Sequence, residues 1–184
     1  MPFATRSECS LELAQVLDSS PLQNIRGSAG LPLAAAASAG QFGFVVGGWG
    51  TGGSVLEGEA ASGNTKTSNA SLIFFLPQNY EAATDITLKI KARTSVVLAT
   101  ASTLDVQAYK SDENGGVGSD LCTTAAQSIN SATWAEISFT ITGTTLNPGD
   151  MLEVYIQCVA DDSTGANAGK SQIGNINFVS STRM

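Results

Sequence analysis

The clearest pattern in the sequence is an alternation of apolar and polar residues with a period of two. From Ile86 to Arg93 every second residue is apolar, and the residues between them are threonine, lysine or arginine. Successive side chains of a strand point to opposite faces, so this pattern predicts a strand with one face in a core and one in solvent. The alternation recurs in residues 104–108, 135–142 and 152–158. Four such strands predict antiparallel sheets packed face to face.

Further strands are expected around these four. The run from Leu72 to Pro77 is continuously apolar and ends at proline, which predicts a strand buried on both faces, for example under a neighbouring subunit. Shorter candidates are residues 41–46, 54–59, 121–129 and 173–179, and Leu146-Asn147-Pro148-Gly149-Asp150 is typical of a tight turn. Roughly eight or nine strands is the number that a jelly roll uses, so we expect an all-β, antiparallel jelly-roll β-sandwich.

The first forty residues differ in character from the rest. Residues 11–17 favour a short strand or a turn or two of helix, and prolines, glycines and an alanine run follow them. Few large side chains come after Leu17, so this segment cannot build a core of its own. We therefore expect an extended N-terminal arm over residues 1–40, ordered against a neighbour, and a jelly-roll domain over residues 41–184.

Charge narrows the range of partners. Charged residues make up 14% of the chain, with nine basic and sixteen acidic residues and a formal net charge of −7. This field repels phosphate backbones, so we expect no nucleic-acid partner. No apolar run approaches the roughly 20 residues that span a bilayer, and the N-terminus lacks a secretory signal pattern. We expect no membrane partner and synthesis in a cytosol.

The absence of histidine excludes most hydrolase mechanisms. Without it there is no Ser-His-Asp or Cys-His arrangement and no His-liganded zinc site. The three cysteines, Cys9, Cys122 and Cys158, are too far apart for a CxxC motif and are interpreted as reduced structural thiols. No nucleophile and base pair is visible, so we expect no enzymatic activity and no cofactor.

Two loops resemble ligand-binding motifs weakly. Residues 112–120 gather acidic side chains and glycines as a Ca²⁺ loop does, but Val117 and Thr123 stand where an EF-hand requires glycine and glutamate. The glycine-rich residues 47–53 lack the GK[ST] sequence of a phosphate-binding loop. We interpret the two segments as an acidic surface loop and a hairpin loop, and expect no metal site.

Other side chains suggest a binding or catalytic surface. Glu57 and Glu59 share one face of an expected strand, as a glycosidase pair could, although a solvated surface position is the simpler interpretation. The amphipathic aromatics that could stack on a sugar ring are Trp49, Trp134, Tyr80, Tyr109 and Tyr155, and of these Tyr109 and Tyr155 fall on the outward phase of their strands. A place at the rim of the core or at a subunit interface is the simpler interpretation of these aromatics.

Several segments of the sequence also resemble those of a known family. They are residues 74–80 leading into 85–92, and residues 117–122, 125–130 and 146–150. These segments resemble the jelly-roll capsid decoration, or cement, proteins of tailed bacteriophages. The similarity extends over roughly residues 40–179. The resemblance implies a homotrimer on the outer surface of a phage head, made in the host cytoplasm, with the major capsid protein as its partner.

Two functions of different classes follow from these observations. The first is a non-enzymatic capsid decoration protein that stabilises the shell, with expected capsid or subunit contacts at Leu11, Leu13, Val16, Leu31, Leu33, Phe74 and Phe75. The alternative is a receptor- or glycan-binding module of a phage head or tail fibre. That module would use the ligand-facing aromatics Trp49, Tyr109 and Tyr155.

Overall fold

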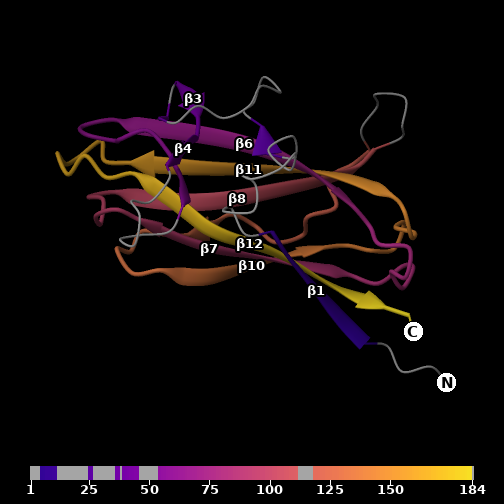
Figure 1. Cartoon of the computed structure of the whole chain (residues 1–184). Helices are drawn as coiled ribbons and strands as arrows, with labels where there is room; N and C mark the ends of the chain where they lie inside the picture. Colours follow the sequence, from indigo (N-terminus) through magenta and orange to yellow (C-terminus); the bar gives the residue numbers. More distant parts are fainter. Residues whose placement is uncertain are drawn as a thin grey trace.

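The chain forms two β-sheets packed against each other (Figure 1). The computed structural model describes residues 5–11, 25–26, 36–37, 39–45, 54–111 and 118–183, and in the first two ranges only the path of the backbone. This part of the chain contains no helix, and hence none long and apolar enough to cross a membrane. The expected all-β jelly-roll sandwich is confirmed.

The first sheet, called sheet A here, has the strand order β10-β7-β12-β5-β4, and β1 also pairs with β12. Its strands are β10 (Ala135–Ile141), β7 (Ile86–Thr94), β12 (Ser171–Thr182), β5 (Val55–Glu57), β4 (Gly43–Val45) and β1 (Thr5–Leu11). All of these pairings are antiparallel, and the register of β12 against β7 is shifted by a bulge between Ile173 and Ile176.

The second sheet, sheet B, has the order β2-β6-β11-β8-β9, and the short strand β3 pairs with β6 in parallel. Its strands are β2 (Ile25–Arg26), β6 (Thr65–Phe75), β11 (Met151–Asp161), β8 (Ala101–Lys110), β9 (Gln127–Ser128) and β3 (Gly40–Gln41). In Figure 1, β11 lies between β6 and β8, which makes these three long strands one continuous surface.

The core lies between the sheets and uses the alternation found in the sequence. Its members from sheet A include Leu88, Ile90, Ile176 and Phe178, and those from sheet B include Leu72, Val106, Val154 and Ile156; each is at most 2% exposed. The rings of Phe74 and Phe178 stack across the two sheets, with centroids 4.3 Å apart. Strands β7, β8 and β11 therefore bury one face here and leave their alternate side chains on the outside. Strand β12 is more enclosed, since Phe178, Val179 and Ser180 are all buried.

The expected strands with clear alternation are present, whereas the weak candidate at residues 121–129 is mostly loop. Of that segment only β9 is a strand, and Cys122 makes an isolated bridge to Ile141. The expected turn at 146–150 is confirmed by the positive φ of Gly149, 84°, and by a hydrogen bond from the Asp150 N–H to the Asn147 carbonyl.

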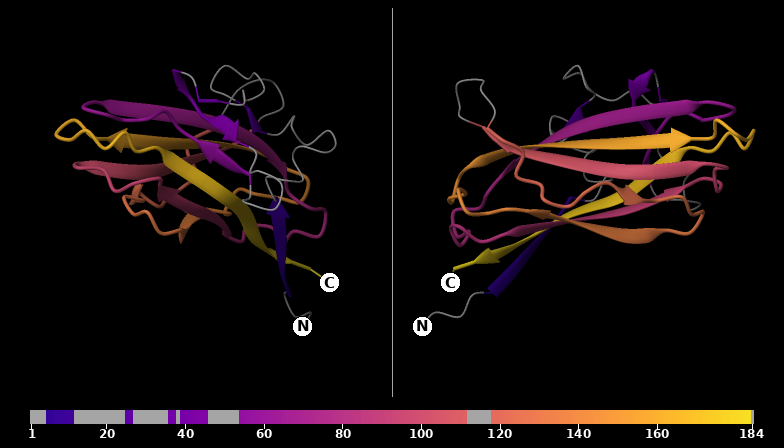
Figure 2. Two further views of the ribbon diagram at one scale, coloured as in Figure 1. Left: turned by 60° about the vertical axis from the view of Figure 1, so that its left-hand side comes forward. Right: turned by 180° about the vertical axis from the view of Figure 1, so that it is seen from behind.

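Parts of the expected N-terminal arm lie in the sheets of their own chain. Strand β1 pairs along the C-terminal half of β12, with Leu11 opposite Ile176, and β2 pairs with β6 (Figure 2). The other arm residues expected to make contacts lie outside the described residues: Leu13, Val16, Leu31 and Leu33. Trp49 and the glycine-rich residues 47–53 also lie outside them.

The two phenylalanines at the end of β6 have different environments. Phe74 is turned toward the core, where it stacks on Phe178, while Phe75 is 62% exposed. Alternate side chains of a strand point to opposite sides, so Phe74 and Phe75 at the end of β6 lie on different faces. The face that carries Phe75 is partly buried within the chain, since Ser71 on the same side is 9% exposed.

Candidate functional site

The outer face of sheet B carries rows of polar and aromatic side chains. Because β11 pairs in register with both β6 and β8, residues from the three strands line up across the sheet. One row is Ser71, Tyr155 and Gln107, and the next is Asn69, Gln157 and Asp105. A third row places Glu153 beside Tyr109, and at the end of the face Phe75 lies opposite Met151. We call this surface the sheet B face.

Two tyrosines form the aromatic part of the sheet B face. The rings of Tyr109 and Tyr155 meet edge to face, with centroids 5.8 Å apart and an interplanar angle of 76°. The Tyr155 hydroxyl donates to Glu153 at 2.7 Å, and the Tyr109 hydroxyl donates to Gln107 at 3.1 Å. Both rings are thus oriented by partners on their own strands, while Tyr155 remains 37% exposed.

The Tyr155 phenol is held in its neutral form. Its hydrogen bond to Glu153, together with partial burial and the charge of the same carboxylate, raises the pKa of Tyr155 to about 12. A donated hydrogen bond stabilises the protonated phenol, and a nearby negative charge disfavours the phenolate. The ring therefore presents an uncharged, amphipathic surface over the whole physiological pH range.

A hollow of about 200 Å³ lies beside Tyr155. It is lined by Asn69, Ala70, Asp105, Gln107, Tyr155, Ile156 and Gln157. Gln157 Nε2 donates to Asn69 Oδ1 at 2.8 Å, which fixes the orientation of both amides. Amide and carboxylate groups next to an exposed aromatic ring supply both hydrogen-bonding and stacking contacts, the combination that ligand sites use.

The structure brings together three residues that the sequence singled out for different reasons. Tyr109 and Tyr155, expected to face a ligand, share the sheet B face with Phe75, expected to make a capsid or subunit contact. The polar residues of the hollow were not expected. The alternation in β8 and β11 places Gln107 and Gln157 on the outer face, but strand pairing alone puts Asn69 beside them.

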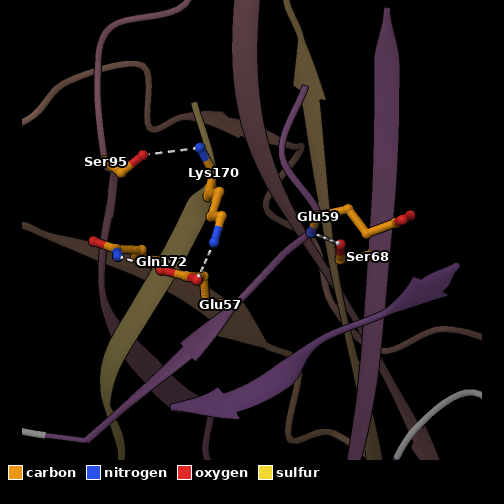
Figure 3. Close-up of polar contacts among 6 residues, drawn as sticks. All are labelled: Glu57, Glu59, Ser68, Ser95, Lys170 and Gln172. Carbon is orange, nitrogen blue, oxygen red and sulfur yellow. Dashed lines mark hydrogen bonds and ion pairs between the residues drawn. The ribbon is translucent and has the colours of Figure 1, made fainter. Parts of the chain in front are cut away.

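Glu57 and Glu59 do not form a carboxylate pair, since each has its own lysine. Figure 3 shows Glu57 beside Lys170, with the Glu59 side chain apart from them. Glu57 Oε1 lies 2.6 Å from Lys170 Nζ, and Gln172 Nε2 donates to Glu57 Oε2 at 2.8 Å. Glu59 lies 3.7 Å from Lys66. The side chain of Glu57 is only 17% exposed, so it is more enclosed than the solvated surface position expected for it.

These partners keep Glu57 ionised. Burial alone would raise the pKa of Glu57, but the hydrogen bonds from Lys170 and Gln172, with the lysine charge, outweigh burial and hold the pKa below its usual value. A carboxylate in this state is a poor proton donor near neutral pH. Glu57 therefore acts as a structural ion-pair partner between β5 and the start of β12.

The acidic loops use their carboxylates to hold backbone. Asp120 accepts two backbone N–H groups at 2.9 Å each, and the fully buried Asp162 accepts two others at 2.9 and 2.6 Å. Residues 112–117 of the acidic loop lie outside the described part of the chain. Among the residues that are described, no group of three acidic or cysteine side chains is placed to hold a metal ion.

No family model and no curated protein matches this sequence. Solved structures similar to it include the xylan-binding module CBM15, with a TM-score of 0.54 and 13% identity over 98% of this chain and 100% of that one. Another is the CBM22-2 xylan-binding domain of Paenibacillus barcinonensis Xyn10C, with a TM-score of 0.52 and 10% identity over 94% and 98% of the two chains. At these identities the likeness establishes the jelly-roll β-sandwich fold.

Proposed function

We propose that this chain is a non-catalytic module that binds a saccharide on the sheet B face. The observation that carries the proposal is the partly exposed Tyr155 ring beside a hollow lined by Asn69, Asp105, Gln107 and Gln157. The likeness of the fold to xylan-binding modules supports it. This function corresponds to the alternative drawn from the sequence, a glycan-binding module, rather than to the capsid decoration protein.

Binding would use groups that are already in place. The Tyr155 ring would stack on the apolar face of a sugar, while the amides of Gln157 and Asn69 and the carboxylate of Asp105 would exchange hydrogen bonds with its hydroxyls. The contacts to Glu153 and between the two amides fix these side chains before a ligand arrives. A preorganised surface loses less conformational entropy on binding, which favours affinity.

The test is calorimetric titration of the full chain with neutral oligosaccharides of xylose, mannose and glucose. We expect at least one of them to bind, and Tyr155→Ala to weaken that binding about tenfold or more, as truncation of a central aromatic contact does. Tyr155→Phe should retain most of the affinity because it keeps the ring. Val97→Ala, which shortens an exposed loop side chain away from this face, is the control.

Two results would contradict the proposed saccharide binding on the sheet B face. If none of the oligosaccharides binds, the saccharide class is wrong. If one binds with equal affinity to Tyr155→Ala and to the unchanged chain, the site lies elsewhere on the molecule.

Capsid decoration is a separate proposal. It is supported by the sequence segments that resemble cement proteins. It is also supported by the exposure of Phe75, one of the residues expected to contact the capsid or another subunit. Density-gradient fractionation of the source lysate tests it through the number of copies that sediment with DNA-filled particles. A ratio near parity with the major capsid protein supports shell decoration, and a few copies per particle support a glycan-binding fibre module. If the protein is absent from the particles, it is neither a shell decoration protein nor a fibre module.

A further inference from the structure

The outer face of sheet A carries a row of basic side chains. Lys89, Lys91 and Arg93 occupy successive outward positions of β7, in a chain whose net charge is −7. Lys89 pairs with Glu136 on the adjacent strand β10, with Nζ and Oε1 3.3 Å apart. Within the described residues, neither Lys91 nor Arg93 makes a salt bridge. Two cations of this row thus have no paired carboxylate among the described side chains.

Arg93 is held rigidly in this row. Its guanidinium lies over the Trp134 ring, 4.6 Å from the centroid. Its Nε donates to Gln172 Oε1 at 2.8 Å, and one terminal nitrogen donates to the Ala132 carbonyl at 3.2 Å. These bonds use two of the five guanidinium N–H groups, so donors are left for a ligand.

The nearest acid on the side of β5 is already neutralised. Gln172 lies between Arg93 and Glu57, accepting from the first through Oε1 and donating to the second through Nε2. Glu57 also has the charge of Lys170 at 2.6 Å (Figure 3). The Arg93 charge is therefore not cancelled by Glu57, and the same hydrogen bonds fix which end of the Gln172 amide faces the arginine.

A hollow of about 540 Å³ opens at these cations. It is lined by Ser54, Val55, Lys91, Arg93, Trp134, Gln172, Gly174 and Asn175. Gly174 lies in the bulge of β12, and a Cβ there would stand 3.5 Å from the Trp134 indole and 3.8 Å from the Lys91 Cβ. The missing side chain keeps the floor of the hollow open, and its volume is within the range of small-molecule sites.

We propose that this hollow, called site A, binds an anionic saccharide. Its carboxylate would accept hydrogen bonds from Arg93 and Lys91, since charge-assisted bonds to an oxyanion are the strong ones. Its ring would pack against the exposed part of Trp134. The indole, the Val55 side chain and the size of the hollow favour a ligand with a sugar body over a bare inorganic anion. Site A lies on the sheet opposite the sheet B face and is independent of the function proposed above.

The experiment uses tryptophan fluorescence. The chain has two tryptophans, so Trp49→Phe leaves Trp134 as the only reporter, and Tyr155→Ala in the same background removes the main contact of the sheet B face. This protein is titrated with an oligosaccharide of glucuronic acid and with the neutral glucose oligosaccharide of equal length. We expect the anionic oligosaccharide alone to change Trp134 emission, with an affinity that falls as salt is raised.

Two lysine variants separate a specific site from general charge. Lys91→Gln should weaken binding about tenfold, the loss expected for one charge-assisted hydrogen bond. Lys89→Gln makes the same change of charge on the same strand, at a lysine already paired with Glu136, and should bind within about twofold of the unchanged protein.

Four results would overturn the proposal. They are no binding of the anionic oligosaccharide, an equal response to the neutral one, equal weakening by the two lysine variants, and inorganic phosphate binding as tightly as the saccharide. Since the titration is made without Tyr155, none of them depends on whether the sheet B face binds a sugar.

Discussion

At the scale of the residue, the exposed aromatic of the sheet B face is controlled by a neighbour two positions away. Glu153 and Tyr155 lie on the same side of β11, because side chains of a strand alternate with a period of two. The hydroxyl of Tyr155 therefore reaches the Glu153 carboxylate, at 2.7 Å. This contact both orients the ring and raises the pKa of the phenol.

We predict that Tyr155 ionises late in an alkaline titration. Its pKa is about 12 in the folded chain and about 10 when unfolded, so the stability it contributes is complete below pH 10 and is lost between about pH 10 and 12. Glu153→Gln removes the main cause of the shift and should bring the ionisation of Tyr155 to lower pH. Tyrosinate absorbance, compared with that of Tyr155→Phe, measures it. An unchanged titration curve in Glu153→Gln would contradict the assigned cause.

At the scale of the element, two contacts hold short or irregular segments to the long strands. One is the Glu57 ion pair, which joins the three-residue strand β5 to Lys170 just before β12. The other is the loop after β10, where Gly143 passes against Thr84 and Tyr80. Each segment is too short, and too little alternating, to be fixed in position by strand pairing and core burial alone. The position of each therefore depends on these local contacts.

Glu57→Gln should destabilise the fold by about 1 to 2 kcal/mol at pH 7, because it removes a charge-assisted hydrogen bond. The folded pKa of Glu57 lies below its ordinary value of 4.5, so this stability is present above that value and disappears as pH falls through the folded pKa. Urea unfolding of the unchanged chain and of Glu57→Gln, at pH 7 and near pH 3, measures the difference in their free energies of unfolding. This difference should be smaller in acid. Glu59→Gln is the matched control, since its ion pair with Lys66 is longer, at 3.7 Å, and its carboxylate is more exposed than that of Glu57, and such pairs contribute little. A difference that persists in acid would contradict the ion-pair explanation.

Gly143→Ala should destabilise the chain by about 3 kcal/mol, which lowers the melting temperature by roughly 6 to 12 °C. A Cβ at this position would overlap the carbonyl oxygen of Thr84, which is backbone and cannot rotate away, and would lie 2.8 Å from the Tyr80 hydroxyl. Gly118→Ala is the control, since within the part of the chain that the structure describes its Cβ would come no closer than 4.0 Å to a neighbour. Calorimetry gives both values, and equal melting temperatures for the two variants would refute the close approach.

At the scale of the whole molecule, the sandwich has a main core between two different outer faces. The sheet B face presents tyrosines, amides and acids, whereas the outer face of sheet A presents the basic row of β7. The core between them includes Cys158, which is 1% exposed. Burial is the main reason that the pKa of Cys158 is raised to about 12, and a hydrogen bond with Ser171 opposes the shift only in part.

Cys158 should therefore report the opening of the whole sandwich. In a Cys9→Ser background at pH 8, we expect a thiol reagent to modify the partly exposed Cys122 in the native state and Cys158 only as fast as the molecule unfolds globally. Mass spectrometry with and without urea follows the two sites. Labelling of Cys158 at the native rate of Cys122 would show that the core opens locally.

Much of the sandwich could be predicted from local patterns. The alternation in β7, β8, β10 and β11 is visible over a few residues, and it assigns Lys91, Tyr109 and Tyr155 to outer faces. The sequence does not predict the first part of β6, because its threonines, serine and asparagine carry no apolar signal and asparagine has low strand propensity. It is a strand because β11 pairs with it along its whole length.

What the sequence determined by itself was the fold class and the direction of the side chains along each strand, since a period of two is a property of neighbouring residues. Which strands lie side by side, and in what register, is set by long-range pairing in the folded chain. Gln157 meets Asn69, 88 residues away, and Gln172 joins Arg93 to Glu57 over separations of 79 and 115 residues. Both candidate sites depend on such pairings, and no local pattern encodes them because register is set by strands that are far apart in the chain.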